Sequence, residues 1–288
     1  MLQKSLEELA QTEGGKAAIK IRKQNNIAQV VFYIFGSLVF VFFMFTFNRY
    51  KIVFYITMVI YLAMGLGVQA YYARIHKILS EECDPFKAEE LYTYYYLAYA
   101  KKKLERRKSP SIKWQYHLYI SSCVMFQGDY ERAFSILNQI DRRALELDRS
   151  RQNLLVSFHA NMRMYYCYKN DEDVLNNMRN YFLQMSEDKH IKRMYRELMK
   201  KEIEMIDLHC SLNRGDFSVY ECLSHRPEWT RSSRLHRVGN RFTDAKVHNM
   251  QKDREAAILD CQYVIENGNR LCYADAAKQM LSDYQIKN

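Results

Sequence analysis

The sequence predicts an all-α protein, in which a two-helix transmembrane hairpin is followed by a superhelix of helical hairpins. Two runs of about 21 residues, 27–47 and 52–72, contain no charged side chain. The 288 residues include only 9 glycines and 3 prolines, which are few for the many tight turns that a sheet protein requires. After residue 110, a short break with an aspartate recurs about every 40 residues, and such a period indicates stacked helix pairs.

The two uncharged runs predict membrane-spanning helices. At 1.5 Å per residue, a 21-residue helix reaches about 31 Å, which is close to the hydrocarbon thickness of a bilayer. The alternative is a pair of buried core helices in a soluble protein. Core helices normally keep a polar stripe, and these two runs have only a few scattered polar side chains. The hairpin 27–72 is therefore the preferred interpretation, with the lipid bilayer as its first partner.

Lysine and arginine predict the orientation of this hairpin. Residues 1–26 hold about 5 basic and 3 acidic side chains, and two more basic residues follow the second run directly. Because cytoplasmic flanks carry the excess of lysine and arginine, both termini are expected in the cytoplasm, as in a multi-pass protein of the plasma membrane. Seven cysteines without a C-x-x-C spacing are typical of a reducing compartment. Segment 1–26 either rests on the anionic inner leaflet or only fixes the topology.

In the juxtamembrane segment 73–110, the second span is expected to continue out of the membrane to about Asp84, and a long helix is expected to follow. Asp84 and Pro85 have the pattern of a helix cap followed by proline at the first helical position, and the helix is expected to end near Lys108. Five tyrosines between residues 92 and 99 are too closely spaced for one face, which predicts neighbours on more than one side. The basic end, 101–108, is either a solvated last turn favoured by the helix dipole or a contact for anionic lipid or an acidic partner.

Residues 111–288 are expected to form a cytoplasmic array of helix pairs. Four breaks, each with aspartate as the second residue, lie about 42, 45 and 37 residues apart. They begin at Gly128, Asn170, Gly215 and Lys252. A repeat of this length made of helix pairs is the signature of a solenoid, and the final helix is expected to cap it.

At these breaks the chain resembles the tetratricopeptide-repeat family, over roughly residues 111–267. The family pattern is a glycine, a small polar or acidic residue, an aromatic residue and, three positions on, an alanine. The first break matches it with Gly128, Asp129, Tyr130 and Ala133. The third matches the turn with Gly215, Asp216 and Phe217, although Tyr220 stands where alanine is usual. The other two breaks match only in part. The resemblance implies a superhelix that binds other proteins.

No catalytic or metal-binding motif occurs in the sequence. There is no H-E-x-x-H, no glycine-rich phosphate loop, no G-x-S-x-G and no Cys/His cluster, and the eight histidines are dispersed. The acidic run 171–173 begins a helix and is assigned to capping. We therefore expect a protein that is not an enzyme and has no cofactor or metal.

A basic zone, 189–241, provides the candidate partner-binding residues. It holds about 12 basic and 7 acidic side chains, and basic residues recur there at spacings of three and four, which places them in stripes along two helices. The stripes are Lys192, Arg196 and Lys200, and Arg231, Arg234, Arg237 and Arg241. If they share one groove, they suit acidic peptides, phosphorylated partners or lipid headgroups; otherwise they are two unrelated solvated faces. Nucleic acid is not expected, because no aromatic-basic platform accompanies them.

These features predict a membrane-anchored scaffold or adaptor that binds cytoplasmic protein or acidic peptide partners at the membrane surface. Tethering raises the effective concentration of the array for partners already at the membrane. The alternative is a membrane-tethered signal receptor whose array binds a small peptide or metabolite. The sequence indicates no oligomeric state.

Overall fold

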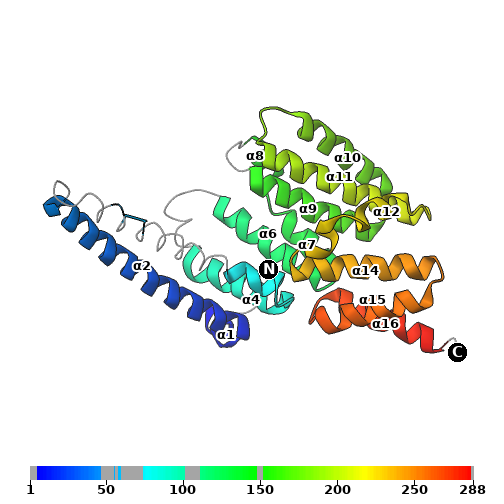
Figure 1. Cartoon of the computed structure of the whole chain (residues 1–288), viewed down its shortest axis with the longest axis horizontal. Helices are drawn as coiled ribbons and strands as arrows, with labels where there is room; N and C mark the ends of the chain where they lie inside the picture. The colour runs from blue at the N-terminus through cyan, green and yellow to red at the C-terminus, as the bar shows by residue number, and fades with distance from the viewer. Residues whose placement is uncertain are drawn as a thin grey trace.

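The computed structural model describes residues 5–46, 55, 58–59, 74–100, 111–147 and 152–286. The regular elements of this described part are all helices, so the predicted all-α class is confirmed. A long helical rod projects from a body of packed helices (Figure 1). The second predicted span, 52–72, lies almost entirely outside the described residues, and so does the basic segment 101–110.

The helices α1 (Leu6–Gln11) and α2 (Glu13–Thr46) form the N-terminal arm. A capping box begins α1: the Ser5 hydroxyl accepts from the backbone of Glu8, whose carboxylate accepts from the backbone of Ser5. The first part of α2 packs on α4 (Pro85–Tyr95). A side chain at Gly14 would place Cβ 2.4 Å from the carbonyl oxygen of Lys87, so glycine permits this close approach. Residues 5–26 therefore dock on the helical body.

Segment 73–110 is divided at the predicted cap. Residues 74–80 are helical, the chain turns at Cys83, and α4 begins at Pro85 with Asp84 as its N-cap, which confirms the predicted cap. The carboxylate of Asp84 accepts from the N–H of Lys87 at 2.9 Å. The division arises because Cys83 has a φ of 53° and proline cannot continue a preceding helix. The π-helical turn η1 (Tyr96–Ala100) follows α4. Helix α4 itself contacts both α2 and α6.

Four helix pairs follow. They are α6 (Ser111–Phe126) with α7 (Tyr130–Leu137), α9 (Gln152–Lys169) with α10 (Glu172–Glu187), α11 (Arg193–Asn213) with α12 (Ser218–Ser224), and α14 (Arg234–Met250) with α15 (Arg254–Asn267). The first helices α6, α9 and α11 pack in succession. The short helices α8 (Arg142–Leu147) and α13 (Pro227–Arg231) lie in connections, and α16 (Cys272–Ile286) packs on α14 and α15.

All four breaks share one backbone conformation. The residue before each aspartate has a positive φ: 88° at Gly128, 55° at Asn170, 73° at Gly215 and 63° at Lys252. The N–H of each aspartate bonds to the carbonyl five residues earlier, as in a Schellman motif. The aspartate side chain then accepts from a backbone N–H two or three residues later. Each break therefore ends one helix and begins the next.

A related turn lies at Cys83 and Asp84, where the aspartate N–H bonds to a carbonyl six residues earlier instead of five. Asp84 donates from its N–H to the carbonyl of Ile78 at 3.3 Å and caps α4, so residues 74–80 and α4 form a further pair ahead of α6. The sequence predicted the helix start at Asp84 but not its likeness to the repeat turns, because cysteine replaces the glycine or asparagine, and proline replaces the aromatic residue.

Small buried residues accompany the turns. Ala88, Ala133 and Ala257, each four positions after a turn aspartate, are 0% exposed. Tyr220 occupies this position in the pair α11–α12 and is also buried. Its hydroxyl donates to the carboxylate of Asp244 at 2.9 Å, so the larger side chain is accommodated because its polar end has a buried partner.

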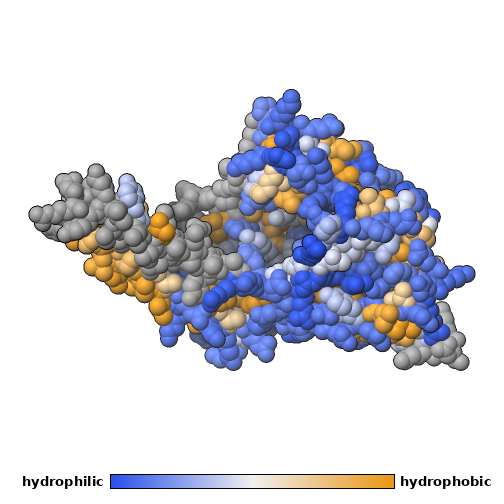
Figure 2. Space-filling model, in the orientation of Figure 1, coloured by the Kyte–Doolittle hydropathy of each residue, from blue (hydrophilic) through white to orange (hydrophobic). Residues whose placement is uncertain are grey.

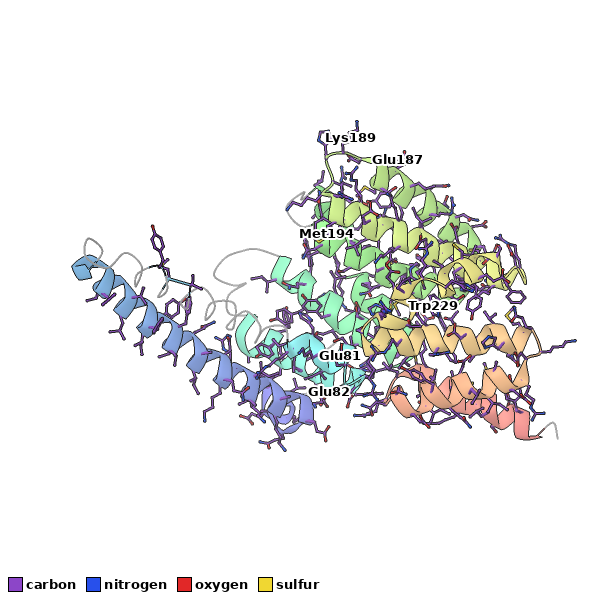
Figure 3. All side chains as sticks on the ribbon, in the orientation of Figure 1. Glu81, Glu82, Glu187, Lys189, Met194 and Trp229 are labelled. Carbon is purple, nitrogen blue, oxygen red and sulfur yellow. The ribbon has the colours of Figure 1, made fainter. Side chains whose placement is uncertain are left out.

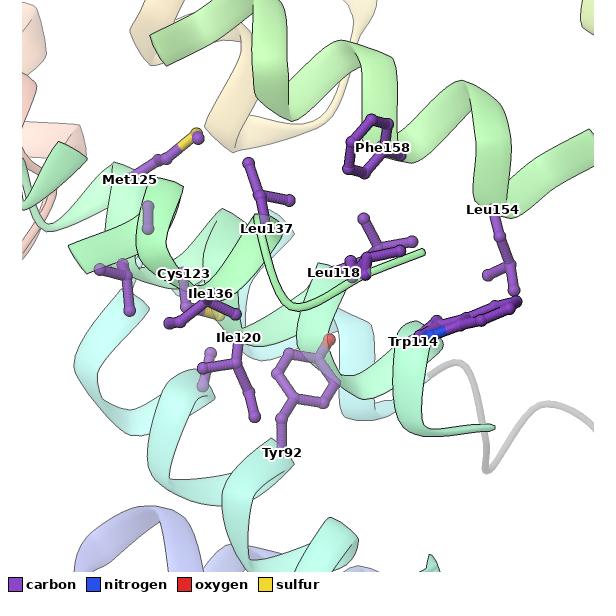
Figure 4. Packing of buried hydrophobic residues seen from close by; sticks show 14 of the residues in the cluster. Tyr92, Trp114, Leu118, Ile120, Cys123, Met125, Ile136, Leu137, Leu154 and Phe158 are labelled. Atoms are coloured by element: carbon purple, nitrogen blue, oxygen red, sulfur yellow. The ribbon is translucent and has the colours of Figure 1, made fainter. Parts of the chain in front are cut away.

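A core between α4, α6, α7 and α9 joins the first pairs (Figure 4). Leu118 of α6 faces Phe158 of α9, and Trp114 faces Leu154. All four side chains are buried, and burying each stabilises the fold by about 1.5–3 kcal/mol.

The C-terminal helices return to the start of the array. The N–H of Arg270 donates to the carbonyl of Cys83 at 3.3 Å, and the side-chain amide of Asn269 donates to the carbonyl of Glu82 at 2.8 Å. Cys83 is fully buried in the cluster formed by α14, α15 and α16. In an open solenoid each repeat contacts only its neighbours. Here the last helices contact the first pair, so the array is closed on itself.

Gly128→Ala should reduce stability more than Gly215→Ala. Both glycines have positive φ, which costs a side chain roughly 1–2 kcal/mol. Only at Gly128 would the new Cβ meet another residue, the Cβ of Cys272 at 3.2 Å; nothing lies within 4 Å at Gly215. Thermal unfolding in detergent measures both losses. Equal losses would contradict the close approach of α16 to the first turn.

Candidate membrane-binding and partner-binding surfaces

The second half of α2 exposes large apolar side chains. They are between 39% and 66% exposed, and part of this surface is orange in Figure 2. The residues are Ile27, Val30, Val31, Tyr33, Ile34, Leu38, Val41 and Phe42. A contiguous apolar surface of this kind marks a contact with a membrane or another protein.

One uninterrupted helix carries both the docked and the exposed part. The 34 residues of α2 run from Glu13 to Thr46 without a break. Ala17, Ala18 and Ile21 pack into the core around α4, whereas the exposed residues begin at Ile27. The part beyond the docked residues, 27–46, is roughly 30 Å long at 1.5 Å per residue. Because the helix is continuous, the docked part sets the direction in which the apolar rod leaves the body.

In the part of the chain that the structure describes, no helix combines the length and the hydropathy needed for crossing a membrane. Thr46 is the last described residue of the first predicted span, 27–47, and only residues 55 and 58–59 of the second are described. The hairpin therefore stays a prediction.

The first basic stripe lies on the first half of α11, a helix whose beginning is marked by Met194 in Figure 3. Lys192 and Lys200 are exposed, whereas Arg196 is half-buried and its Nε has no hydrogen-bond partner in the described residues. The first turn of α11 contains no acidic residue, and Lys192 at the N-cap makes no side-chain cap. Positive charge at this end opposes the helix dipole, so an acidic partner here would relieve an unfavourable arrangement.

The second stripe is mostly engaged within the chain. Three of its four arginines donate to oxygen atoms at 2.5 to 2.9 Å: Arg234 to the carbonyl of Asn267, Arg237 to the carbonyl of Ser232, and Arg241 to the carboxylate of Asp260. Arg231 is exposed and makes no hydrogen bond or ion pair within the described residues. Of this stripe, Arg231 therefore has the guanidinium most available to a partner.

Lys201, directly after the first stripe, lies close enough to His236, between Arg234 and Arg237 of the second, to affect its pKa. Burial, and then the neighbouring Lys201 ammonium of α11, lower the pKa of His236 on α14. The first turns of α14 thus face α11. The accessible predicted cations are Lys192, Arg231 and Lys200, although Lys200 forms an exposed ion pair with Glu197 at 3.1 Å. Arg234, Arg237 and Arg241 hold α14 to its own surroundings.

A third group of charges, between α9, α11 and α14, could not be seen in the sequence. Arg163 and Glu202 form an ion pair at 2.6 Å, with side chains 14% and 16% exposed. Lys246 is accessible to solvent but makes no ion pair within the described residues, and desolvation lowers its pKa. Burial, and then Lys246 and Arg163, lower the pKa of His209. These residues come from three helices, so no local motif reveals them.

The described residues contain no group of three or more His, Cys, Asp or Glu side chains arranged to hold a metal ion. Burial raises the pKa values of the thiols of Cys83, Cys167 and Cys210, which makes them less reactive. Cys222 on α12 is the exposed cysteine.

No protein-family model, no curated protein and no solved structure matches this chain. The resemblance to the tetratricopeptide-repeat family therefore rests on the turn residues alone.

Proposed function

We propose that this protein is a membrane-anchored scaffold, in which a hairpin 27–72 tethers a closed, tetratricopeptide-like helical array that binds an acidic segment of a protein partner at the cytoplasmic face. The observation that carries the proposal is the exposed apolar half of α2, which continues directly from a half docked on the array. The length of this apolar half fits a membrane-spanning helix, and the basic residues before it fit a cytoplasmic N-terminal side.

The partner-binding residues we propose are the accessible cations of the first half of α11 and, separately, Arg231. Lys192 and Lys200 are exposed there. Exposed cations of this kind suit a segment that carries acidic residues.

Reversing Lys192, Lys200 and Arg231 to glutamate should reduce the recovery of the partner about tenfold or more, because each reversal places like charges together. Partners would be captured from detergent-solubilised membranes and quantified for each variant at two salt concentrations. The control reverses Arg143, Arg214 and Lys278, which are exposed elsewhere and change the net charge equally. Unchanged recovery and salt dependence with the first variant would rule out these partner-binding residues.

Anchoring is better tested by substitution than by deletion of residues 1–73. Such a deletion removes α1 and the docked half of α2, and so uncovers Leu91 and the rest of the face of α4 that they cover. Loss of binding would then report damage to the array.

One observation favours the receptor alternative. Arg270 and Asn269 hold the turn at Cys83, shortly after the second predicted span. A ligand that shifted the C-terminal helices would act on this turn directly. A ligand-dependent rise in melting temperature would favour the receptor over a scaffold.

A further inference from the structure

A cavity of about 180 Å³ lies between α8, α9 and α10. Phe158 and His159, which line it, are buried, and the lining residues Met162, Val174 and Met178 are half-buried. An engineered apolar cavity of about 150 Å³ is large enough for benzene. The space therefore fits one aromatic ring or one branched aliphatic chain.

Arg142 of α8 gives this cavity a positive charge. Its guanidinium carbon lies 5.7 Å from the centroid of the Tyr181 ring, which also lines the cavity. Nε of Arg142 donates to Glu146 at 2.7 Å, and its two terminal nitrogens make no hydrogen bond within the described residues. A guanidinium presents such nitrogens as a fork for a carboxylate. Glu146 is a weak competitor because its pair with Arg142 is exposed.

His159 adds a buried polar group without a partner. Its side chain is 3% exposed, and its Nε2 makes no hydrogen bond in the described part of the chain. The ring packs against Tyr181, with centroids 4.8 Å apart. Burial, and then Arg142, lower the pKa of His159 to about 3, so the ring is neutral at physiological pH. An unmade hydrogen bond here is costly, and a bound carboxyl or hydroxyl group could supply it.

We propose that this cavity binds a small carboxylic acid with an aromatic or branched aliphatic body. The body occupies the space beside Phe158, Met162 and Met178, and the carboxylate pairs with the terminal nitrogens of Arg142. This chemistry occurs in free acids and at the C-terminal residue of a peptide. The proposal is independent of membrane anchoring, since α2 contributes nothing to the cavity.

The test is calorimetric titration of the full chain in nanodiscs with phenylacetate, 4-methylpentanoate and the peptide Gly-Gly-Phe. The neutral controls are phenylacetamide and the amidated peptide. We expect saturable binding of at least one acid, weakened about tenfold when its carboxylate is made an amide, because the ionic fork is then lost. Arg142→Gln should weaken binding equally. Arg143→Gln, an exposed neighbour outside the cavity, should leave it unchanged.

Preferential binding of the peptide would assign the cavity to chain ends, and preferential binding of the free acids would assign it to metabolites. Either supports the proposal. Absence of saturable binding of all three probes at millimolar concentration, by protein with an unchanged circular dichroism spectrum, would overturn it. So would equal weakening by Arg142→Gln and Arg143→Gln.

Discussion

Replacing Val31, Ile34 and Leu38 with lysine should release the protein from the membrane. These side chains are 50%, 57% and 62% exposed on the projecting half of α2. A lysine near the centre of a spanning helix costs about 2.5–3.5 kcal/mol, so three together cost about 8–10 kcal/mol. The measurement is the fraction of protein that stays with membranes after alkaline extraction, and we expect it to fall from nearly all to a minor part.

The matched control replaces three exposed apolar residues of the array with lysine. Met194, Leu147 and Leu259 are 62%, 76% and 67% exposed, but they lie on helices that our account keeps in water. This variant should stay with the membrane. Retention of the α2 variant, or equal release of both, would contradict insertion of α2 in lipid.

Lowering the pH from about 6.5 to about 4 should destabilise the helical body. His117 and His159 are 2% and 3% exposed, and burial lowers their pKa values to about 4 and about 3. In the unfolded chain histidine has a pKa near 6.5. Below that pH the unfolded state binds protons that the native state does not, so stability falls as the pH falls. Each histidine contributes up to about 1.4 kcal/mol per pH unit in this window.

Thermal unfolding between pH 7 and pH 4.5 measures this dependence. His159→Phe keeps an aromatic ring against Tyr181 and Phe182 but removes one site of proton uptake, so it should flatten the curve clearly. The same exchange at the exposed His190 is the control. Desolvation raises the pKa of Asp244. This carboxyl group therefore favours the native state as the pH falls, which offsets part of the loss caused by the histidines. A curve that is flat in the parent protein, or unaffected by His159→Phe, would contradict the buried neutral histidine.

The sequence predicted the features that are encoded locally. The all-α class follows from composition, and the cap at Asp84 follows from two adjacent residues. The turns at Gly128 and Gly215 have positive φ, which glycine adopts without a steric penalty. At Cys83 a similar conformation is held by contacts with α14–α16, and such contacts leave no trace in the local sequence.

The features that the sequence missed depend on residues far apart in the chain. Gly14 contacts Lys87, Arg270 reaches the turn at Cys83, and Arg163 pairs with Glu202. The second basic stripe also shows that the local sequence does not reveal long-range contacts. Its spacing indicates a shared helix face, but only the fold shows that Arg241 is paired with Asp260 of α15. Spacing therefore locates a charge without showing whether it is available to a partner.

The most direct test of a cytoplasmic array on a membrane anchor is the labelling of Cys222 with a membrane-impermeant maleimide. Cys222 is exposed on α12, and Cys222→Ser identifies its share of the signal. We predict that protein which sediments with membranes is labelled only after the cells are permeabilised. Labelling of Cys222 on intact cells, or recovery of the full-length protein in the soluble fraction without detergent, would contradict the account.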